Sequence, residues 1–203
     1  YHDSSRGLAD WEPALTTIAK DSSISEVILS GGDPLSLSDD RLARLSGRIA
    51  EIPQITRLRI HTRWPVMIPE RVCSSLLDWL TASRPRAIVV IHANHANEID
   101  EHVAAALRRL IDAGLTVLNQ AVLLRQVNDD FAALSDLSLR LVDLGVIPYY
   151  LHQLDPVAGA AHFEVPESKG LELIARLRAS LPGYAVPQYV RETPGAASKI
   201  PLT

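Results

Sequence analysis

Cysteine is almost absent from this chain of 203 residues, in which Cys73 is the only one. A single thiol excludes a disulfide within the chain, and it excludes any cluster that needs several thiolates from this chain. No apolar run reaches the roughly 18 residues that a membrane span requires. The first residues also lack the basic and apolar regions of a signal peptide. We therefore expect no membrane partner and a cytoplasmic location.

The chain also lacks an excess of positive charge. Its 20 Lys and Arg residues are outnumbered by 24 Asp and Glu residues, which gives a net charge of −4 and a pI near 6.0. Without a basic excess to neutralise phosphates, no nucleic-acid partner is expected. A hydrophobic content of 47% and a mean hydropathy of +0.07 are typical of a globular protein and exclude disorder. The chain has no initiator methionine, so we expect it to be a piece of a longer protein.

Short apolar, β-branched runs recur along the chain at nearly constant spacing. Their centres are 29 to 32 residues apart and fall at Ile28, Ile60, Val89, Leu118 and Tyr149. Apolar residues at steps of three and four, the pattern of amphipathic helices, occur before, between and after them, over residues 8–20, 39–52, 69–82, 101–113, 131–144 and 168–180. Strands that alternate with helices predict a parallel sheet, as in a (β/α) barrel or a doubly wound fold.

This alternation stops after about Asp155. Glycine, alanine and proline accumulate in residues 156–159 and again in residues 194–197. We therefore predict a partial barrel over residues 1–155. Residues 156–203 are predicted to form a C-terminal extension packed on that barrel and not a separate domain.

Polar residues follow each predicted strand. They are 30–34 (Ser-Gly-Gly-Asp-Pro), 61–63 (His-Thr-Arg), 92–98, Asn119 with Gln120, and 152–155 (His-Gln-Leu-Asp). The carboxyl ends of parallel strands meet at one edge of the sheet or one mouth of a barrel, which is where ligands bind in such folds. The sequence therefore predicts a site at this edge.

Several of these residues allow more than one interpretation. The residues at 30–34 could form only a turn. His61, His92 and His95 could hold a metal ion, as in a metal-dependent hydrolase barrel. Gln120 would be an unsatisfied amide if it were simply buried, so a ligand or a neighbouring backbone must meet it. Lys199 could be a surface lysine, although its small neighbours would also admit a bulky aldehyde cofactor.

Taken together, these segments resemble the lysine 2,3-aminomutase family of radical S-adenosylmethionine (SAM) enzymes. The similarity runs in order from about residue 24 to the C-terminus. The matching stretches are LSGGDPL (29–35), RIHTR (59–63), NHANEI (94–99), NQAVLLR (119–125), VND (127–129), PYYLHQLD (148–155) and PGAASK (194–199). Within the family, GAAHF (159–163) and the short tail after Lys199 are most similar to the branch that serves β-lysylation of elongation factor P.

The resemblance implies a partial TIM-like barrel of the radical SAM type, with about five of its six parallel strands present. It also implies three cofactors: pyridoxal 5′-phosphate (PLP), SAM and a [4Fe–4S] cluster. The residues that match SAM-binding positions are Gly31, Gly32, Asp33, His92 and Gln120. Those that match PLP-binding positions are Gln120, His152 and the catalytic lysine, Lys199, which holds PLP covalently. His152 departs from the tyrosine of many relatives.

For the substrate, the resemblance implies L-lysine, with Asp155 and Glu192 receiving its side-chain ammonium group. Glu192 is one methylene longer than the aspartate of some relatives. The implied reaction is an isomerisation that moves the α-amino group of L-lysine to the β-carbon. The product is expected to be used for β-lysylation of elongation factor P.

One departure from the family pattern concerns the cluster. The family binds it through a CxxxCxxC motif just before the position of Tyr1, and this chain has only Cys73, within a helical pattern. We therefore expect an N-terminally truncated and, by itself, inactive fragment with no metal ligands of its own. The alternatives are the metal-dependent hydrolase barrel and a non-catalytic remnant that binds PLP or an amino acid.

Overall fold

The centre of the molecule is one curved sheet of seven strands whose spatial order follows the sequence. The computed structural model describes residues 8–203; the start of the predicted barrel, residues 1–7, lies outside them. Six strands pair in parallel and the short seventh is antiparallel to the sixth. They are β1 (Glu26–Leu29), β2 (Arg57–Thr62), β3 (Arg86–His92), β4 (Thr116–Val122), β5 (Ile147–His152), β6 (Gln188–Arg191) and β7 (Ile200–Pro201).

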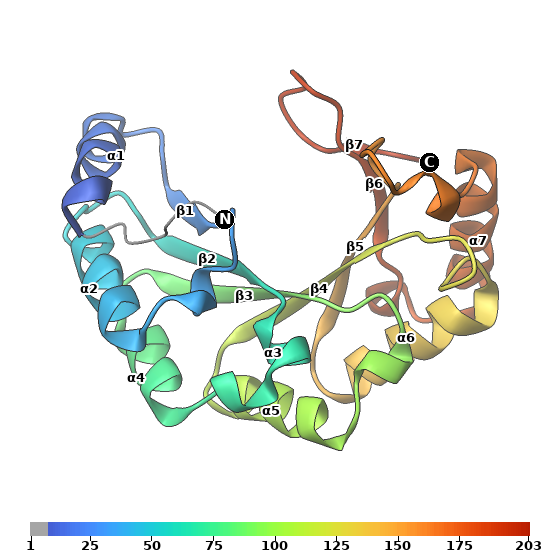
Figure 1. The fold of residues 1–203 in the computed structure, drawn as a ribbon, viewed down its shortest axis with the longest axis horizontal. Helices are drawn as coiled ribbons and strands as arrows, with labels where there is room; N and C mark the ends of the chain where they lie inside the picture. The colour runs from blue at the N-terminus through green and yellow to red at the C-terminus, as the bar shows by residue number, and fades with distance from the viewer. Residues whose placement is uncertain (1–7) are drawn as a thin grey trace.

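Helices cover the convex side of this sheet and leave the concave side open, so the fold is a half-barrel (Figure 1). The α-helices are α1 (Leu8–Lys20), α2 (Asp39–Ala50), α3 (Trp64–Met67), α4 (Ser74–Ala82), α5 (Glu101–Asp112), α6 (Phe131–Asp143) and α7 (Glu167–Ser180). Short 3₁₀ turns are η1 (Pro34–Ser36), η2 (Pro69–Arg71), η3 (Ala96–Glu98), η4 (Ala161–Phe163) and η5 (Gly183–Ala185). Among the described residues, no helix is long and apolar enough to cross a membrane.

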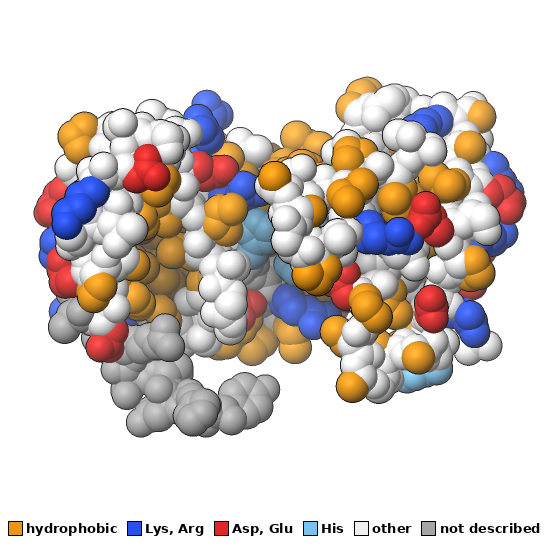
Figure 2. Space-filling view, turned by 90° about the horizontal axis from the view of Figure 1, so that it is seen from above, with side chains coloured by type: hydrophobic (Ala, Val, Ile, Leu, Met, Phe, Trp, Pro, Cys, Tyr) orange, Lys and Arg blue, Asp and Glu red, His pale blue; other side chains and the backbone are white. Residues whose placement is uncertain are grey.

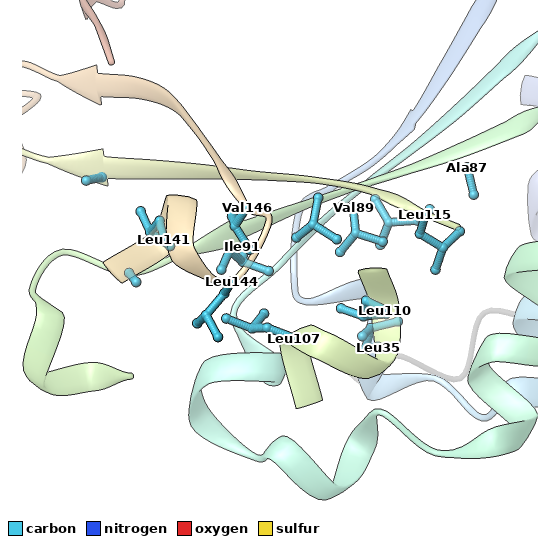
Figure 3. Close-up of a cluster of buried hydrophobic side chains, with 14 of the residues drawn as sticks. Leu35, Ala87, Val89, Ile91, Leu107, Leu110, Leu115, Leu141, Leu144 and Val146 are labelled. Atoms are coloured by element: carbon cyan, nitrogen blue, oxygen red, sulfur yellow. The ribbon is translucent and has the colours of Figure 1, made fainter. Parts of the chain in front are cut away.

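The core lies between the convex face of the sheet and these helices. Alternate residues of a strand point to opposite faces, so Leu58 and Ile60 of β2 are fully buried in the core while Arg59 and His61 face the concave side. The same layer contains Val89 and Ile91 of β3, with Leu107 and Leu110 of α5 and other apolar side chains packed nearby (Figure 3). The apolar side chains of the strands therefore pack against the helices, and the alternate side chains face the concave side.

Most of the predicted elements are present, and the predicted partial barrel of parallel strands is confirmed. The helix predicted over 69–82 is wrong in part, because the segment is divided into η2 and α4. The break lies at Val72, with φ −79° and ψ 70°, and at Cys73, with φ −96° and ψ 173°, which are not helical backbone angles. The sequence analysis also did not predict β6, the sixth parallel strand. The boundary at residue 155 remains a prediction, and residues 156–203 supply β6 and β7 to the same sheet.

Helix α7 approaches β6 closely because of one glycine. A Cβ atom at Gly170 would overlap the phenol of Tyr189, lying 2.6 Å from its Cε1. Tyr189 is fully buried and donates its hydroxyl hydrogen to Gln153, whose amide nitrogen donates in turn to the carbonyl of Val165 at 2.9 Å. The segment that leads from β6 to Lys199 is therefore fixed to the barrel by a buried hydrogen-bonded chain.

Candidate functional site

The concave face of the half-barrel is polar. The strand register places the side chains of Arg59, His61, His92, Gln120 and His152 on this face, opposite the core. From above, histidine side chains lie in the central hollow between the two sides of the molecule (Figure 2). Four polar atoms on this face are buried and have no hydrogen-bond partner among the described residues: Arg59 Nε, His61 Nε2, Gln120 Oε1 and His152 Nε2. Because buried polar groups are normally satisfied within the protein, their clustering here indicates a position for a polar ligand.

Lys199 reaches this face from the loop between β6 and β7, which projects above the open side of the sheet (Figure 1). Its ammonium group pairs with Glu192 and lies 5.7 Å from the centre of the Tyr150 ring. Glu192 Oε1 is also 3.9 Å from His152 Nδ1. The structure therefore brings together three of the residues identified from sequence, Lys199, Glu192 and His152.

The ionisation of these groups follows from burial. Burial lowers the pKa of Lys199, and the charge of Arg59 acts in the same direction, while Asp155 opposes it. Burial also lowers the pKa of His152 to about 4, assisted by the charge of Lys199. The pKa of His61 is lowered to about 4 as well, first by burial and then by Arg59. At neutral pH the imidazoles are therefore uncharged, and the amine form of Lys199, which is the nucleophilic form, is more accessible than in water.

Two stacked tyrosines line the wall beside Lys199. Tyr149 and Tyr150 lie with their ring centres 3.7 Å apart, and the hydroxyl of Tyr149 donates to that of Tyr150 at 2.9 Å. A bulge in the pairing of β4 with β5 accompanies this arrangement. Burial raises the pKa of Tyr150 to about 12, so its hydroxyl keeps its proton at neutral pH and can donate it to a ligand.

Gln120 and His92 contact each other across β3 and β4. The amide nitrogen of Gln120 donates to His92 Nε2 at 2.7 Å. Burial lowers the pKa of His92, in keeping with an uncharged ring that accepts this hydrogen bond. The amide nitrogen of Gln120 is therefore met by a side chain, that of His92, and not by a neighbouring backbone, one of the two partners that were expected. Its carbonyl oxygen has no partner among the described residues.

The loop after β1 is ordered by Asp33. Its carboxylate accepts hydrogen bonds from the Leu35 amide at 3.0 Å, the Thr62 hydroxyl at 2.7 Å and the Arg63 amide at 2.6 Å. Gly31 and Gly32 have φ values of +79° and +56°, which other residues rarely adopt, and a Cβ atom on either would meet nothing within 4 Å. The two glycines therefore expose bare backbone to open space at the carboxyl end of a strand, where a ligand can reach it.

Three asparagines, of which Asn119 and Asn128 are buried, join the ends of β3 and β4. Asn119 exchanges two hydrogen bonds with the backbone of Ala93, at 2.9 and 3.0 Å. Asn94 accepts from the amide of Val122, and fully buried Asn128 donates to the carbonyls of Asn94 and Val122. This asparagine network (Asn94, Asn119 and Asn128) sets the positions of the residues that carry His92 and Gln120.

Asp155 lines a cavity of about 490 Å³. The cavity is lined by Gln153, Asp155, Glu164, Arg191 and residues of the loop 154–161. Its polar lining has two carboxylates and one guanidinium, which suits a ligand with a cationic end.

The structure does not support the metal-dependent alternative. Within residues 8–203, no group of three or more His, Cys, Asp or Glu side chains is arranged to hold a metal ion. The rings of His61 and His92 are 6.4 Å apart, centre to centre. His95 instead caps η3, where its Nδ1 accepts from the amide of Asn97 at 3.1 Å. Its position is therefore explained by local structure.

Sequence analysis missed Arg59, Glu26 and Tyr150 on this face. Arg59 of β2 pairs with Glu26 of β1 at 2.8 Å, and the Tyr150 ring lies against Lys199. A signal was available, because Arg59 alternates with apolar Leu58 and Ile60 and therefore shares a face with His61.

The fold belongs to a known class. A radical SAM methyltransferase from Sphaerobacter thermophilus superposes on 91% of the chain, and on 57% of its own length, with a TM-score of 0.59 and 18% identity. A domain of pyruvate-formate lyase-activating enzyme from Bacteroides vulgatus superposes on 82% of the chain and 98% of that domain, with a TM-score of 0.56 and 17% identity. The fold is that of the radical SAM enzymes.

Sequence comparison is more specific. No protein-family model matches the chain. It is 43% identical over 202 residues to the L-lysine 2,3-aminomutase of Escherichia coli and 38% identical over 200 residues to that of Clostridium subterminale. These alignments cover 100% and 98% of the chain, but 59% and 48% of the two relatives. The chain is thus a homologue of the L-lysine 2,3-aminomutases that spans about half the length of the relatives it matches, and the resemblance identified from its motifs is confirmed.

Proposed function

We propose that this chain is the ligand-binding half-barrel of an L-lysine 2,3-aminomutase, an isomerase that moves the α-amino group of L-lysine to the β-carbon. The observation that carries the proposal is the position of Lys199, which folds back over the concave face against Tyr150 and next to Glu192. Homology to L-lysine 2,3-aminomutases over nearly the whole chain supports the same activity.

The residues of the concave face fit PLP. Lys199 is a partly buried amine with a lowered pKa, as covalent binding of an aldehyde requires. The buried, unpartnered atoms of Gln120 and His152 provide an acceptor and a ring nitrogen for the cofactor. Gly31, Gly32 and Asp33 at the end of β1 fit the methionine part of SAM, with His92 and Gln120 beside it. When bound, SAM with a reduced [4Fe–4S] cluster supplies an organic radical, and PLP supplies a conjugated carrier for the migrating nitrogen.

Glu192 has two tasks in this proposal. In the structure it neutralises the ammonium group of Lys199. With PLP bound at Lys199, the Glu192 carboxylate would be available to the side-chain ammonium of substrate lysine. Asp155 provides the second carboxylate, at the cavity of about 490 Å³. Two carboxylates around one ammonium favour a charged side chain over an apolar one of equal length, because unpaired buried charges are costly.

The proposal extends to β-lysylation of elongation factor P in the cytoplasm, with no nucleic-acid or membrane partner. Its support is the similarity of the segment GAAHF (159–163) to the branch of the family that serves this modification. The segment contains η4 and is bonded to the loop after β4 by a hydrogen bond from the Arg125 amide to the Phe163 carbonyl at 2.9 Å. Mass spectrometry of elongation factor P from cells with and without the gene tests this part. An unchanged mass would leave β-lysine as a free metabolite.

Covalent trapping tests the central claim. The chain is incubated with PLP, reduced with borohydride and mapped by peptide mass spectrometry. We expect the pyridoxyl group on Lys199 and its loss in Lys199→Arg, which keeps a positive charge for Glu192. Lys169→Arg, at a partly exposed lysine of α7, is the matched control and should leave the labelling unchanged. Labelling at other lysines with none at Lys199 would overturn the proposal.

A further inference from the structure

Two incompletely satisfied donors lie side by side on β2. Arg59 and His61 are two residues apart in the strand and point to the same, concave face. Arg59 Nη2 pairs with Glu26 at 2.8 Å, but Arg59 Nε is buried and unpartnered, and so is His61 Nε2, among the residues described. The Arg59 side chain is only 18% exposed. A buried donor without an acceptor is costly, so two adjacent ones indicate a place for an acceptor from outside the chain.

The charges around Arg59 and His61 indicate which kind of hydrogen-bond acceptor would bind there. A guanidinium is always protonated and matches the oxygens of carboxylates and phosphates. The charge of Arg59 lowers the pKa values of both His61 and Lys199, so Arg59 lies within electrostatic reach of the lysine. Glu26 pairs with Arg59 and Glu192 pairs with Lys199, so both cations already have one carboxylate partner. The observation that calls for a further acceptor is the pair of buried, unpartnered nitrogen atoms, Arg59 Nε and His61 Nε2, and the guanidinium favours an anionic one.

We propose that Arg59 Nε and His61 Nε2 form an oxyanion subsite that faces Lys199 and receives the phosphate of PLP or the α-carboxylate of the amino-acid substrate. The proposal rests on the proposed function for the identity of these ligands. Arg59 supplies the permanent positive charge and a fixed donor direction, and His61 donates as an uncharged ring through its Nε2 hydrogen. The Glu26 carboxylate holds the guanidinium against the sheet, so its Nε stays directed at the concave side.

Paired ligands distinguish the two sources of the oxyanion. Fluorescence titration measures the dissociation constants of two pairs of ligands. The first pair is PLP and pyridoxal, which lacks the phosphate. The second pair, measured in the presence of PLP, is L-lysine and 1,5-diaminopentane, which lacks the carboxylate. In Arg59→Gln, a loss of about tenfold or more for PLP with pyridoxal unchanged supports the phosphate. The same loss for L-lysine with the diamine unchanged supports the carboxylate. His61→Phe, which keeps a flat ring without a donor, should lose at least about threefold for the same ligand.

Arg57→Gln is the matched control. Arg57 lies on the same strand and face, is exposed, and bonds to Ser25 and Thr56 outside the proposed subsite. The double variant Glu26→Gln/Arg59→Gln removes both charges together and replaces Arg59→Gln if that variant loses its circular-dichroism spectrum. Ligand preferences in the Arg59 variants equal to those of Arg57→Gln would overturn the subsite.

Binding of inorganic phosphate tests the subsite independently of the proposed function, because it is expected to require Arg59 but not Lys199. If borohydride trapping fails at Lys199 while phosphate affinity still falls in Arg59→Gln, the subsite stands and the aminomutase proposal does not. If trapping succeeds and the Arg59 variant keeps every ligand preference, the aminomutase proposal stands and the subsite is refuted.

Discussion

Gly170→Ala is expected to destabilise the whole half-barrel. The added methyl group would overlap the buried phenol of Tyr189, because α7 and β6 leave no space between them. Overpacking of this kind costs about 1–3 kcal/mol, and loss of the buried bond between Tyr189 and Gln153 costs about another 1–3 kcal/mol. The better helix propensity of alanine returns roughly 0.5–1 kcal/mol. The net loss is about 1–5 kcal/mol, which lowers the thermal midpoint of a chain of this size by roughly 2–20 °C.

Differential scanning calorimetry measures this shift, and Gly47→Ala provides an internal comparison. Gly47 lies inside α2, and a Cβ atom there meets nothing within 4 Å, so this variant should gain about 0.5–1 kcal/mol. A second variant, Gly170→Ala with Tyr189→Leu, removes the overlapping ring and should recover part of the loss caused by the methyl group. A Gly170→Ala chain as stable as wild type would refute the close approach of α7 to β6. Because β6 leads to Glu192, Gly170→Ala should also weaken PLP binding.

Three further outcomes are expected. The pKa values of His61 and His152 are about 4 in the folded chain, against an ordinary value of 6.5, so the unfolded chain binds more protons between pH 4 and pH 6.5. The free energy of unfolding should therefore fall as the pH decreases from 6.5 to 4. Urea unfolding measures this fall, which should be smaller in His152→Gln. Asn128→Ala leaves the carbonyls of Asn94 and Val122 without their donor and should cost about 2–4 kcal/mol by the same assay; a cost below about 1 kcal/mol would contradict the asparagine network. With Cys73 as its single cysteine, this chain incubated with SAM and dithionite should form no 5′-deoxyadenosine above a protein-free blank.

The parallel half-barrel could be predicted from sequence because its strands and helices recur at a fixed spacing with clear periodicity. The sixth strand could not, since β6 has only four residues and follows a helix in a segment rich in proline and glycine. The break in the helix predicted over residues 69–82 depends on the backbone angles of Val72 and Cys73, which hydrophobic periodicity does not report.

The ends of the strands were correctly expected to gather polar groups, but their partners required coordinates. The sequence gives no sign that Gln120 meets His92 or that Lys199 meets Glu192, because each pair joins distant segments. His95 shows the opposite error. As part of a histidine-rich stretch it suggested a metal ligand, whereas its ring is used to begin a 3₁₀ turn. Local hydrogen bonding of this kind competes with ligand binding for the same side-chain atoms.

The asparagine network has a consequence for how this protein can vary. Amide groups, and not tight packing, set the heights of β3 and β4 relative to each other where His92 and Gln120 are presented. Substitutions among the leucines of α5 and α6 should therefore lower the melting temperature while leaving ligand affinity almost unchanged. The outer helical layer is then free to diverge during evolution, whereas divergence at the three amides disturbs the positions of His92 and Gln120.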